Sequence, residues 1–514
     1  MSKVTKATIG LMIITILSKI VGFARETILV SIHGANIVSD VYITSMNIPW
    51  ILFGIIGTAL GTAFIPVFFE VEKNEGKDNA LKFTNNVFNI VIVLSSILSL
   101  LGFVFAESLV KIFAMKFEGD KLILATSFTR IMIFGLVFIS LNSIMTCWLQ
   151  IKGKFVISGM SAFPNNILII VSIILSSQGN VYIMAIGTFL AWISQFLFQY
   201  VFSKQNGFKY KLNINLKDKY IKKLYTLILP MLIGVGVNQI NSIIDRSLAS
   251  SLGDGIITIL NSANRLNGFV QSLITTSIVA VTYPMLSKIS VDRDTSKISD
   301  VITKSTNVIT LLIIPISVGS IVLSEPVVRC IFERGQFTSS ATMMTADALA
   351  AYSIGMIGFS LREVLNRIFY SLKDTRTPMV NGVLAMLMNI VLNFILIKSN
   401  GHVGLALATS LSSIICIALL FNSLKKKISY FGQDKILKNL FKSMIASIVM
   451  GIVTKYVYTI SSVYLGAGTI QDILTLSISI ITGIVVYGVC IIVLKVEEMK
   501  IIIELLKQKH SINI

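Results

Sequence analysis

The chain consists largely of long apolar stretches separated by short polar or charged breaks. Hydrophobic residues make up 54% of its 514 residues and charged residues only 13%, about half the share that is usual in a soluble protein. The runs are continuous and long enough for membrane-spanning helices, whereas barrel strands alternate. The sequence therefore predicts an all-α polytopic membrane protein. Its fourteen predicted spans are 7–32, 38–69, 84–110, 123–149, 157–177, 181–203, 224–250, 256–286, 300–324, 340–370, 377–398, 402–424, 439–460 and 472–495.

Basic residues predict how these spans are oriented. Lys and Arg gather in alternate connections, most densely in 204–223 and 425–438. Short basic connections stay on the cytoplasmic side of a membrane. With an even number of spans, both termini are therefore predicted to be cytoplasmic. The net charge of +19 comes largely from these connections, so we expect a membrane-lipid environment and no nucleic-acid partner.

An internal repeat predicts two lobes. Residues 166–188 resemble residues 389–410, and Arg25 in the first span corresponds to Arg246 in the seventh, both at an offset of roughly 220 residues. Parallel repeats of this kind are common in transporters. The predicted domains are an N-lobe of helices 1–6 (1–205), a basic cytoplasmic linker (206–223), a C-lobe of helices 7–12 (224–425), and helices 13–14 with a cytoplasmic tail (426–514).

Charged residues inside the apolar spans give the main indication of function. Each costs roughly 2.5–3.5 kcal/mol at a helix centre, so such residues usually face a watery interior and mark a path for a substrate or an ion. This pattern predicts a transporter with a central polar cavity. The residues are Lys19, Arg25, Glu26, Asp40, Asp245, Arg246 and Arg265.

The arginines among them are candidate ligands for an anionic headgroup. A planar guanidinium suits phosphate oxygens, and both Arg25 and Arg265 lie well inside their spans. Lys19 is a weaker third candidate, and Arg246 is a fourth. For Arg25, the alternative is a structural ion pair with Glu26 or Asp40.

Polar residues of later spans predict a cation site. Asn389 and Asn393 are four residues apart and share one face of a helix, and Thr409 lies on the next span. Together with Asp245 they form an all-oxygen set that suits a hard monovalent cation such as Na⁺. The alternative is hydrogen bonding between helices.

Charged residues near span ends are candidate gates or ion pairs. Glu363 and Arg367 have the favourable i,i+4 order, and Arg362 precedes them. They lie close to the predicted cytoplasmic break, and a plain salt bridge at a helix end is the alternative interpretation. Glu26 and Asp40 are the corresponding candidates near the start of the chain.

Enzyme motifs are missing from the sequence. It contains no G-x-S-x-G elbow, Walker A loop, dinucleotide fingerprint or H-E-x-x-H pair. Its four cysteines are isolated, without a C-x-x-C pair. We therefore expect a transporter without a catalytic site or organic cofactor. An ion gradient, the membrane potential or the substrate's own gradient would drive it.

Several strings resemble the MurJ/MviN family of flippases. They are S-K-I-V-G-F-A-R-E at 18–26, F-I-P-V-F at 64–68, S-A-N-R-L at 262–266, I-F-E-R-G-Q-F-T at 331–338 and F-Y-S-L-K-D-T-R-T-P at 369–378. The resemblance implies the multidrug/oligosaccharidyl-lipid/polysaccharide exporter fold, with two six-helix lobes around a cationic cavity and two extra helices. It also implies a bacterial plasma-membrane protein, expected to be monomeric. Its implied activity is to flip lipid II, the undecaprenyl-pyrophosphate-linked peptidoglycan precursor, from the inner to the outer leaflet.

The resemblance also implies roles for individual residues, and this chain departs from the family pattern at two places. Arg25 and Arg265 match essential cavity arginines of the family, and Asp40 matches its acidic residue in the second span. Lys19 stands where many members have arginine. After Pro49, many relatives carry an Arg-Arg pair, whereas this chain reads W-I-L-F-G. Two alternatives therefore stay open: a flippase for another undecaprenyl-linked glycan (teichoic acid, capsule or O-unit), or a cation-coupled drug antiporter of the same superfamily.

Overall fold

The computed structural model describes residues 3–291, 295–466 and 468–496, and in these residues all regular structure is α-helical. The all-α prediction is therefore confirmed. Packing divides the chain into two compact units. The first unit is Met1–Thr258 with Arg334–Thr338, and the second is Ile259–Glu333 with Ser339–Ile514.

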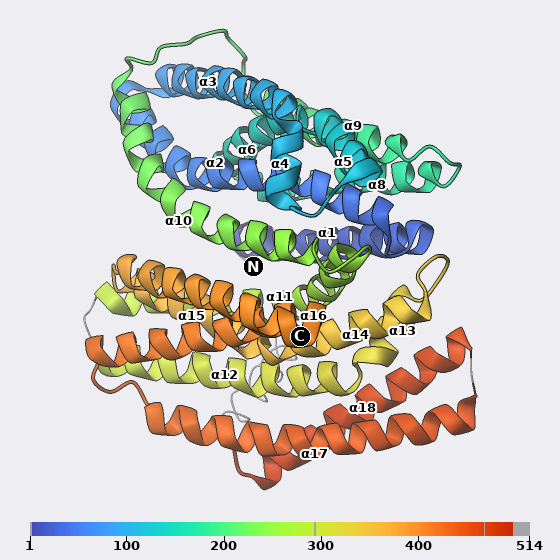
Figure 1. The fold of residues 1–514 in the computed structure, drawn as a ribbon. Coiled ribbons are helices and arrows are strands. Elements are labelled where there is room, and N and C mark those ends of the chain that lie inside the picture. Colours follow the sequence, from blue (N-terminus) through green and yellow to red (C-terminus); the bar gives the residue numbers. More distant parts are fainter. Residues whose placement is uncertain (1–2, 292–294, 467, 497–514) are drawn as a thin grey trace. The chain divides into compact units, whose positions relative to one another are not determined.

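The first unit is built around α2, which packs against α3, α5, α6 and α10 (Figure 1). Helix α1 packs against α7 and α8, and α9 lies against α6 and α8. The helices are α1 (Lys3–His33), α2 (Ile37–Glu75), α3 (Lys77–Val104), α4 (Ala106–Phe113), α5 (Gly119–Met132), α6 (Gly135–Ile151), α7 (Phe155–Met160), α8 (Ala162–Ser176), α9 (Tyr182–Gln205) and α10 (Lys219–Ala249).

A tight turn separates α1 from α2. Gly34 has a φ of +70°, which lets the chain leave α1. Asn36 then caps α2: its side-chain oxygen accepts from the Val38 amide at 2.9 Å, and the Ser39 hydroxyl accepts from the Asn36 amide at 3.0 Å. This capping box fixes where α2 begins.

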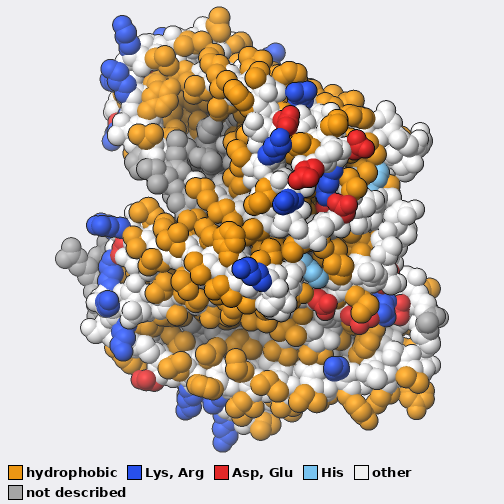
Figure 2. Space-filling model, in the orientation of Figure 1, with side chains coloured by type: hydrophobic (Ala, Val, Ile, Leu, Met, Phe, Trp, Pro, Cys, Tyr) orange, Lys and Arg blue, Asp and Glu red, His pale blue; other side chains and the backbone are white. Residues whose placement is uncertain are grey.

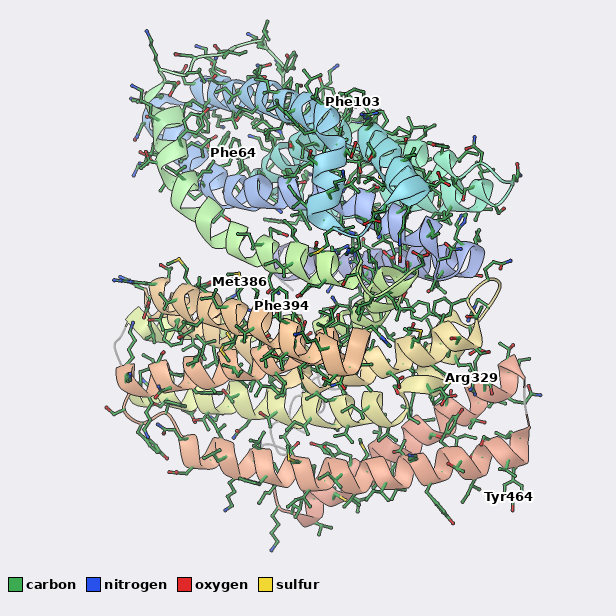
Figure 3. All side chains as sticks on the ribbon, in the orientation of Figure 1. Phe64, Phe103, Arg329, Met386, Phe394 and Tyr464 are labelled. Atoms are coloured by element: carbon green, nitrogen blue, oxygen red, sulfur yellow. The ribbon has the colours of Figure 1, made fainter. Side chains whose placement is uncertain are left out.

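Aromatic side chains fill the core of the first unit. Phe64 is fully buried and stacks on Phe83, with their ring centroids 5.7 Å apart. Phe68 meets Trp148 edge-on at 5.8 Å. Figure 3 shows Phe64 inside this bundle and Phe103 projecting from it. Such aromatic pairs add about 0.5–1.5 kcal/mol beyond the burial of their area.

The second unit is built around α12, which contacts α14, α15 and α17. Helices α17 and α18 form an antiparallel pair, and Figure 3 shows Tyr464 projecting where α17 ends, at the same end of the unit as Arg329. The helices are α11 (Ile256–Val291), whose first residues belong to the first unit, α12 (Thr295–Val322), α13 (Ser324–Phe332), α14 (Ser339–Ile354), α15 (Met356–Ser371), α16 (Arg376–Lys427), α17 (Gln433–Leu465) and α18 (Thr469–Val493).

Helix α16 contains two predicted spans. Its 52 residues are interrupted at Gly401, where φ is +53° and ψ is −127°, so the chain turns there between 377–398 and 402–424. Before α16, the Asp374 carboxylate accepts from the Thr377 amide at 3.0 Å and from its hydroxyl at 2.7 Å. The Lys427 ammonium, where α16 ends, lies 2.8 Å from the same carboxylate. These contacts tie both ends of α16 together.

Length and composition identify membrane-spanning helices. Among the described residues, seven helices are long and apolar enough to cross a membrane, and nine are counted if each of two helix pairs bent by 41° is one span. All fourteen predicted segments fall on helices, but the predicted number of fourteen spans is not confirmed. In each unit viewed by itself, hydrophobic side chains cover much of the visible face and charges gather toward helix ends (Figure 2).

The boundary between the units differs from the predicted lobes. Helix α10, assigned to the C-lobe (224–425), packs against α2 and α4 of the first unit. The prediction rested on a sequence repeat, whereas the division into units reflects packing. The arrangement of two six-helix lobes and a separate C-terminal pair therefore stays a prediction.

Candidate functional site

Arg25 is held in place on the face of α1 that packs against α8. Its Nη2 lies 2.6 Å from the Glu26 carboxylate, and its Nη1 donates to the Asn166 side-chain oxygen at 3.3 Å. Asn166 in turn donates to the carbonyl of Ala162 at 2.8 Å, which orients its oxygen toward α1. The Arg25 side chain is 15% exposed and that of Glu26 is 4% exposed.

This geometry decides between the two partners predicted for Arg25. The arginine pairs with Glu26, while Asp40 lies in a different network. A guanidinium has more donor hydrogens than these contacts use, so Arg25 retains the capacity to bind an anion at its exposed edge. Glu26 and Asn166 would fix the orientation of the planar guanidinium group with which Arg25 binds a ligand.

The other predicted headgroup ligands are held differently. Lys19 is partly buried on α1, and Arg246 is partly buried in the last turn of α10. Arg265 is exposed on α11 and belongs to the second unit. Because Arg25 and Arg265 lie in different units, the cationic cavity that they are predicted to share stays a prediction.

Asp40 is fully buried at the start of α2 and binds the start of α11. One carboxylate oxygen accepts from the Thr258 amide at 2.9 Å and from its hydroxyl at 2.7 Å. The other accepts from the Gly255 amide at 2.7 Å and lies 3.5 Å from the Lys121 ammonium. A carboxylate in this position stabilises the partial positive charge at the N-terminus of α11.

The turn between α1 and α2 receives two further segments of the first unit. The Gln336 amide donates to the carbonyl of Ser31 at 2.8 Å. Gly335 has a φ of +62°, and a Cβ there would lie 2.1 Å from the same carbonyl. A Cβ on Gly255 would lie 2.3 Å from the carbonyl of Ala35. Both close approaches require glycine, which explains the glycine of the E-R-G-Q-F string.

The predicted cation ligands fall into two groups. Asn393 donates to the Asn389 side-chain oxygen at 3.1 Å, and Asn389 donates to the Thr409 hydroxyl at 3.5 Å, so these residues of α16 lie together in the second unit. Asp245 belongs to the first unit, where it accepts from Asn241 at 3.3 Å. The trio forms the interhelical hydrogen bonds of the alternative interpretation, and a site that joins it to Asp245 stays a prediction.

The three charged residues predicted as a gate or ion pair all lie on α15. Arg362 is partly buried against Gly382 of α16, where a Cβ would meet its Nη2 at 3.3 Å. Glu363 is exposed and Arg367 is partly buried. Glu363 and Arg367 have the i,i+4 spacing on α15. Their proposed part in a gate stays a prediction.

Sequence reasoning missed several partners of the predicted residues. Asn166 lies 141 residues from Arg25, and Thr258 lies 218 residues from Asp40. Lys121 precedes the fourth predicted span, its side chain is 10% exposed, and it also binds Asp254 at 2.7 Å. The only available signal was an amide or a cation inside or beside an apolar span, and this signal does not identify a partner.

Comparisons with known proteins agree on one family. A family model described as "Lipid II flippase MurJ" matches residues 29–478. "Probable lipid II flippase MurJ" of Vibrio cholerae serotype O1 is 31% identical over 506 residues, which cover 95% of this chain and 94% of that protein. "Lipid II flippase MurJ" of Burkholderia cenocepacia is 27% identical, with 80% and 82% of the two chains covered.

Solved structures give the same result for the fold. "Lipid II flippase MurJ, inward closed conformation" aligns with a TM-score of 0.80 at 27% identity and covers 93% of this chain and 97% of that chain. An inward-facing MATE transporter of the MOP superfamily aligns with a TM-score of 0.70 at 14% identity, with 81% and 96% covered. This second likeness shows the fold alone.

The helical fold and the buried charges within it define a multi-pass membrane protein of the transporter class. Its fold is the one that MOP-superfamily transporters adopt. The family model and the relatives cover most of its length, and the chain belongs to the MurJ family.

Proposed function

We propose that this chain flips lipid II from the inner to the outer leaflet of a bacterial plasma membrane, by alternating access, for cell-wall synthesis. Relatives and a solved structure that carry the name lipid II flippase support this substrate. The positive-inside pattern supports cytoplasmic termini. We infer that the protein acts as a monomer, without an enzymatic step.

The observation that carries the proposal is the arrangement around Arg25. An arginine oriented by Glu26 and Asn166 is suited to bind two phosphate oxygens at once. In the proposed cycle, Arg25 and Arg265 bind the pyrophosphate, and Lys19 and Arg246 add positive charge. The prenyl tail remains in lipid while the two halves rock and expose the headgroup on the outer side.

The proposal is tested by separate Arg25→Ala and Arg265→Ala variants in a strain depleted of its own flippase. We expect both to fail to restore growth and to accumulate lipid II in the inner leaflet. Arg130→Ala is the matched control, because Arg130 lies 5.5 Å from the Phe103 ring at an exposed position and has no proposed part in binding. Full rescue by both cavity variants would overturn the proposal.

We further propose that Asp40 contributes to a gate on the outer side and that a monovalent cation couples to transport. The buried network that joins Asp40 to α11 supports the gate. The amide and hydroxyl oxygens of Asn389, Asn393 and Thr409 support Na⁺ as the cation, with Asp245 supplying the charge. Flipping by reconstituted Asn389→Ala protein should lose its Na⁺ dependence; an unchanged Na⁺ dependence would remove this site.

A second candidate substrate is another undecaprenyl-linked glycan. The segment after Pro49 favours it, since Trp50 is 42% exposed there in place of the arginine pair of many relatives. A tryptophan offers a stacking surface to a sugar and no charge to a phosphate. Reconstituted flipping of lipid II and of a teichoic-acid precursor, measured side by side, distinguishes the two substrates.

A further inference from the structure

The connection between α9 and α10, residues 208–217, contains neither helix nor strand, is held along α3 and ends in a turn at Leu216 and Lys217; it is called the strap here (Figure 1). Two asparagines of α3 each donate a hydrogen bond to the strap backbone and accept one from it. Asn85 donates to the carbonyl of Lys209 and accepts from the Lys211 amide, both at 2.9 Å. Asn86 donates to the carbonyl of Asn215 at 2.9 Å and accepts from its amide at 2.8 Å.

A third asparagine of α3 completes this ladder. Asn89 donates to the carbonyl of Lys211 at 3.0 Å and to that of Asn213 at 3.3 Å. The Tyr210 hydroxyl donates to the Asn89 oxygen at 2.8 Å. The three asparagines are nearly fully buried, so the strap is fixed in register and is not a loose linker.

The ladder leaves an apolar row of the strap uncovered, beside exposed lysines. It binds backbone groups of odd-numbered residues, and successive side chains of an extended chain point to opposite sides. Leu212, Ile214 and Leu216 are 79%, 52% and 58% exposed. Three apolar side chains at alternate positions on a rigid backbone form a continuous exposed edge. An edge of this kind needs a partner with an apolar surface.

Lysines accompany this apolar edge. Lys209, Lys211 and Lys217 are exposed, and residues 204–223 carry seven lysines against the single acid Asp218. Lys219 and Lys223 are paired with glutamates of α2, whereas no ion pair involves the three strap lysines among the described residues. Clusters of basic residues beside a membrane span bind anionic lipids, each contributing about a fivefold gain in affinity.

The neighbouring helices α9 and α3 place the strap at a membrane boundary. It follows α9, which is long and apolar enough to span a membrane, and lies on the third and fourth turns of α3. The 28 residues of α3 rise about 42 Å, more than the ~30 Å hydrocarbon core. The ladder, Asn85 to Asn89, lies where the polar first turns of α3 pass into the apolar run that begins at Val87, as expected where a helix enters the bilayer.

We propose that the strap is an interfacial binding site for anionic phospholipids. Leu212, Ile214 and Leu216 enter the boundary between headgroups and acyl chains. The strap lysines alternate with this edge and reach lipid phosphates at the headgroup level through their long, flexible side chains. The lysines distinguish this occupant from a peptide strand or a second copy of the chain, because an apolar protein surface would leave them uncompensated. The cytoplasmic leaflet as its location rests on the proposed orientation of the chain; the site itself does not depend on flipping.

The first test measures whether lipid covers the apolar edge. A fluorophore is attached to Leu212→Cys in the full chain, with Cys330 and Cys490 replaced by serine and the buried Cys147 and Cys416 kept. The matched control carries it at Asn213→Cys, the next residue, whose side chain points the other way. In nanodiscs of phosphatidylglycerol and phosphatidylcholine with brominated acyl chains, we expect at least about twofold stronger quenching at position 212.

Two results would overturn the proposal. Equal quenching at positions 212 and 213 would show that the edge does not enter the bilayer. A blue-shifted emission at position 212 without quenching by brominated lipid would show that protein covers the edge, either a second copy or a bound peptide strand.

The second test measures charge selectivity and the role of the ladder. With the label at position 212, Lys209→Gln, Lys211→Gln and Lys217→Gln together should reduce the response to phosphatidylglycerol by about tenfold or more, since each lysine adds electrostatic attraction. Asn85→Ala with Asn89→Ala should abolish the contrast between positions 212 and 213. Asn79→Ala should preserve it, because Asn79 is partly buried on the same helix but bonds Glu75 and Lys82. An undiminished phosphatidylglycerol response in the lysine variant, or an undiminished contrast in the ladder variant, would contradict the proposed site.

Discussion

Asp40 and Asp374 make nearly the same contacts in different units of the molecule. Each carboxylate accepts from a backbone amide and a threonine hydroxyl at the start of a helix, and each lies near a lysine ammonium. Asp40 reaches a threonine 218 residues away and is fully buried. Asp374 reaches a threonine three residues away, and its side chain is 16% exposed.

The same set of contacts has a different role at each position. At Asp374 it begins a helix locally and joins the two ends of α16. At Asp40 it fastens two helices that are distant in sequence, and water cannot replace a lost partner there. We therefore expect the same substitutions to have larger effects at the buried network than at the exposed one.

The largest expected difference is between Asp40→Asn and Asp374→Asn. An amide at position 40 presents only one acceptor to two backbone donors and removes the charge beside Lys121, so we expect a loss of about 3 kcal/mol in the free energy of unfolding. Asp374→Asn keeps a good capping side chain and should lose less than about 1 kcal/mol. Thermal unfolding of both purified variants measures this; equal losses would remove the distinction.

The sequence predicts the two carboxylate sites to different extents, because their partners lie at different distances along the chain. The partner of Asp374 is Thr377, only three residues away, so a side chain bonding near the start of α16 is a local feature of the string K-D-T-R-T-P. For Asp40 the sequence predicted a gate or ion-pair residue, but neither Lys121 nor Thr258 could be identified as its partner. The position of a long-range partner depends on how helices pack, and apolar spans of similar composition do not encode it in a readable pattern.

The same reasoning applies to the fold as a whole. Continuous apolar runs predicted helices at all fourteen segments because hydrophobicity and length are local properties. The break at Gly401 coincides with a predicted connection. Arg25 was found as a buried charge, whereas its partner Asn166 was not. The packing of α10 against α2 and α4 could not be read from the sequence, since a sequence repeat carries no information on packing.

Removing only the threonine hydroxyl from each network gives a second comparison of Asp40 with Asp374. Thr258→Val and Thr377→Val delete one hydrogen bond each and keep the volume of the side chain. The buried carboxylate of Asp40 is then left with an uncompensated acceptor, so we expect a loss of about 1.5 kcal/mol for Thr258→Val and about 0.5 kcal/mol for Thr377→Val. Chemical denaturation in detergent provides the values, and a reversed order would contradict the assignment of the buried network as the stronger one.

The smallest expected effect is a pH dependence at Asp374, because solvent screening of its pairing with the exposed Lys427 keeps the ionic contribution small. Partial burial of this carboxyl opposes ionisation, but hydrogen bonds from Lys427 and Thr377 outweigh it and lower its pKa to about 2. A depressed pKa stabilises the fold above the unfolded-state value of about 4, and this stabilisation is lost as the pH falls toward 2. The stability difference between the wild type and Asp374→Ala should therefore be constant above about pH 5 and disappear near pH 2; a constant difference down to pH 2 would refute it.

The closed ends of α16 have a consequence for how the protein enters the membrane during synthesis. Arg376 and Lys425 to Lys427 stand at opposite ends of the helix in sequence but on the same side of the folded hairpin. If its two legs inserted one after the other, the first would have no neighbour to pack against. Inserting both legs as one unit keeps Arg376 and Lys425 to Lys427 on their own side of the bilayer, and it leaves only the turn at Gly401, which carries Lys398 and His402, to be translocated.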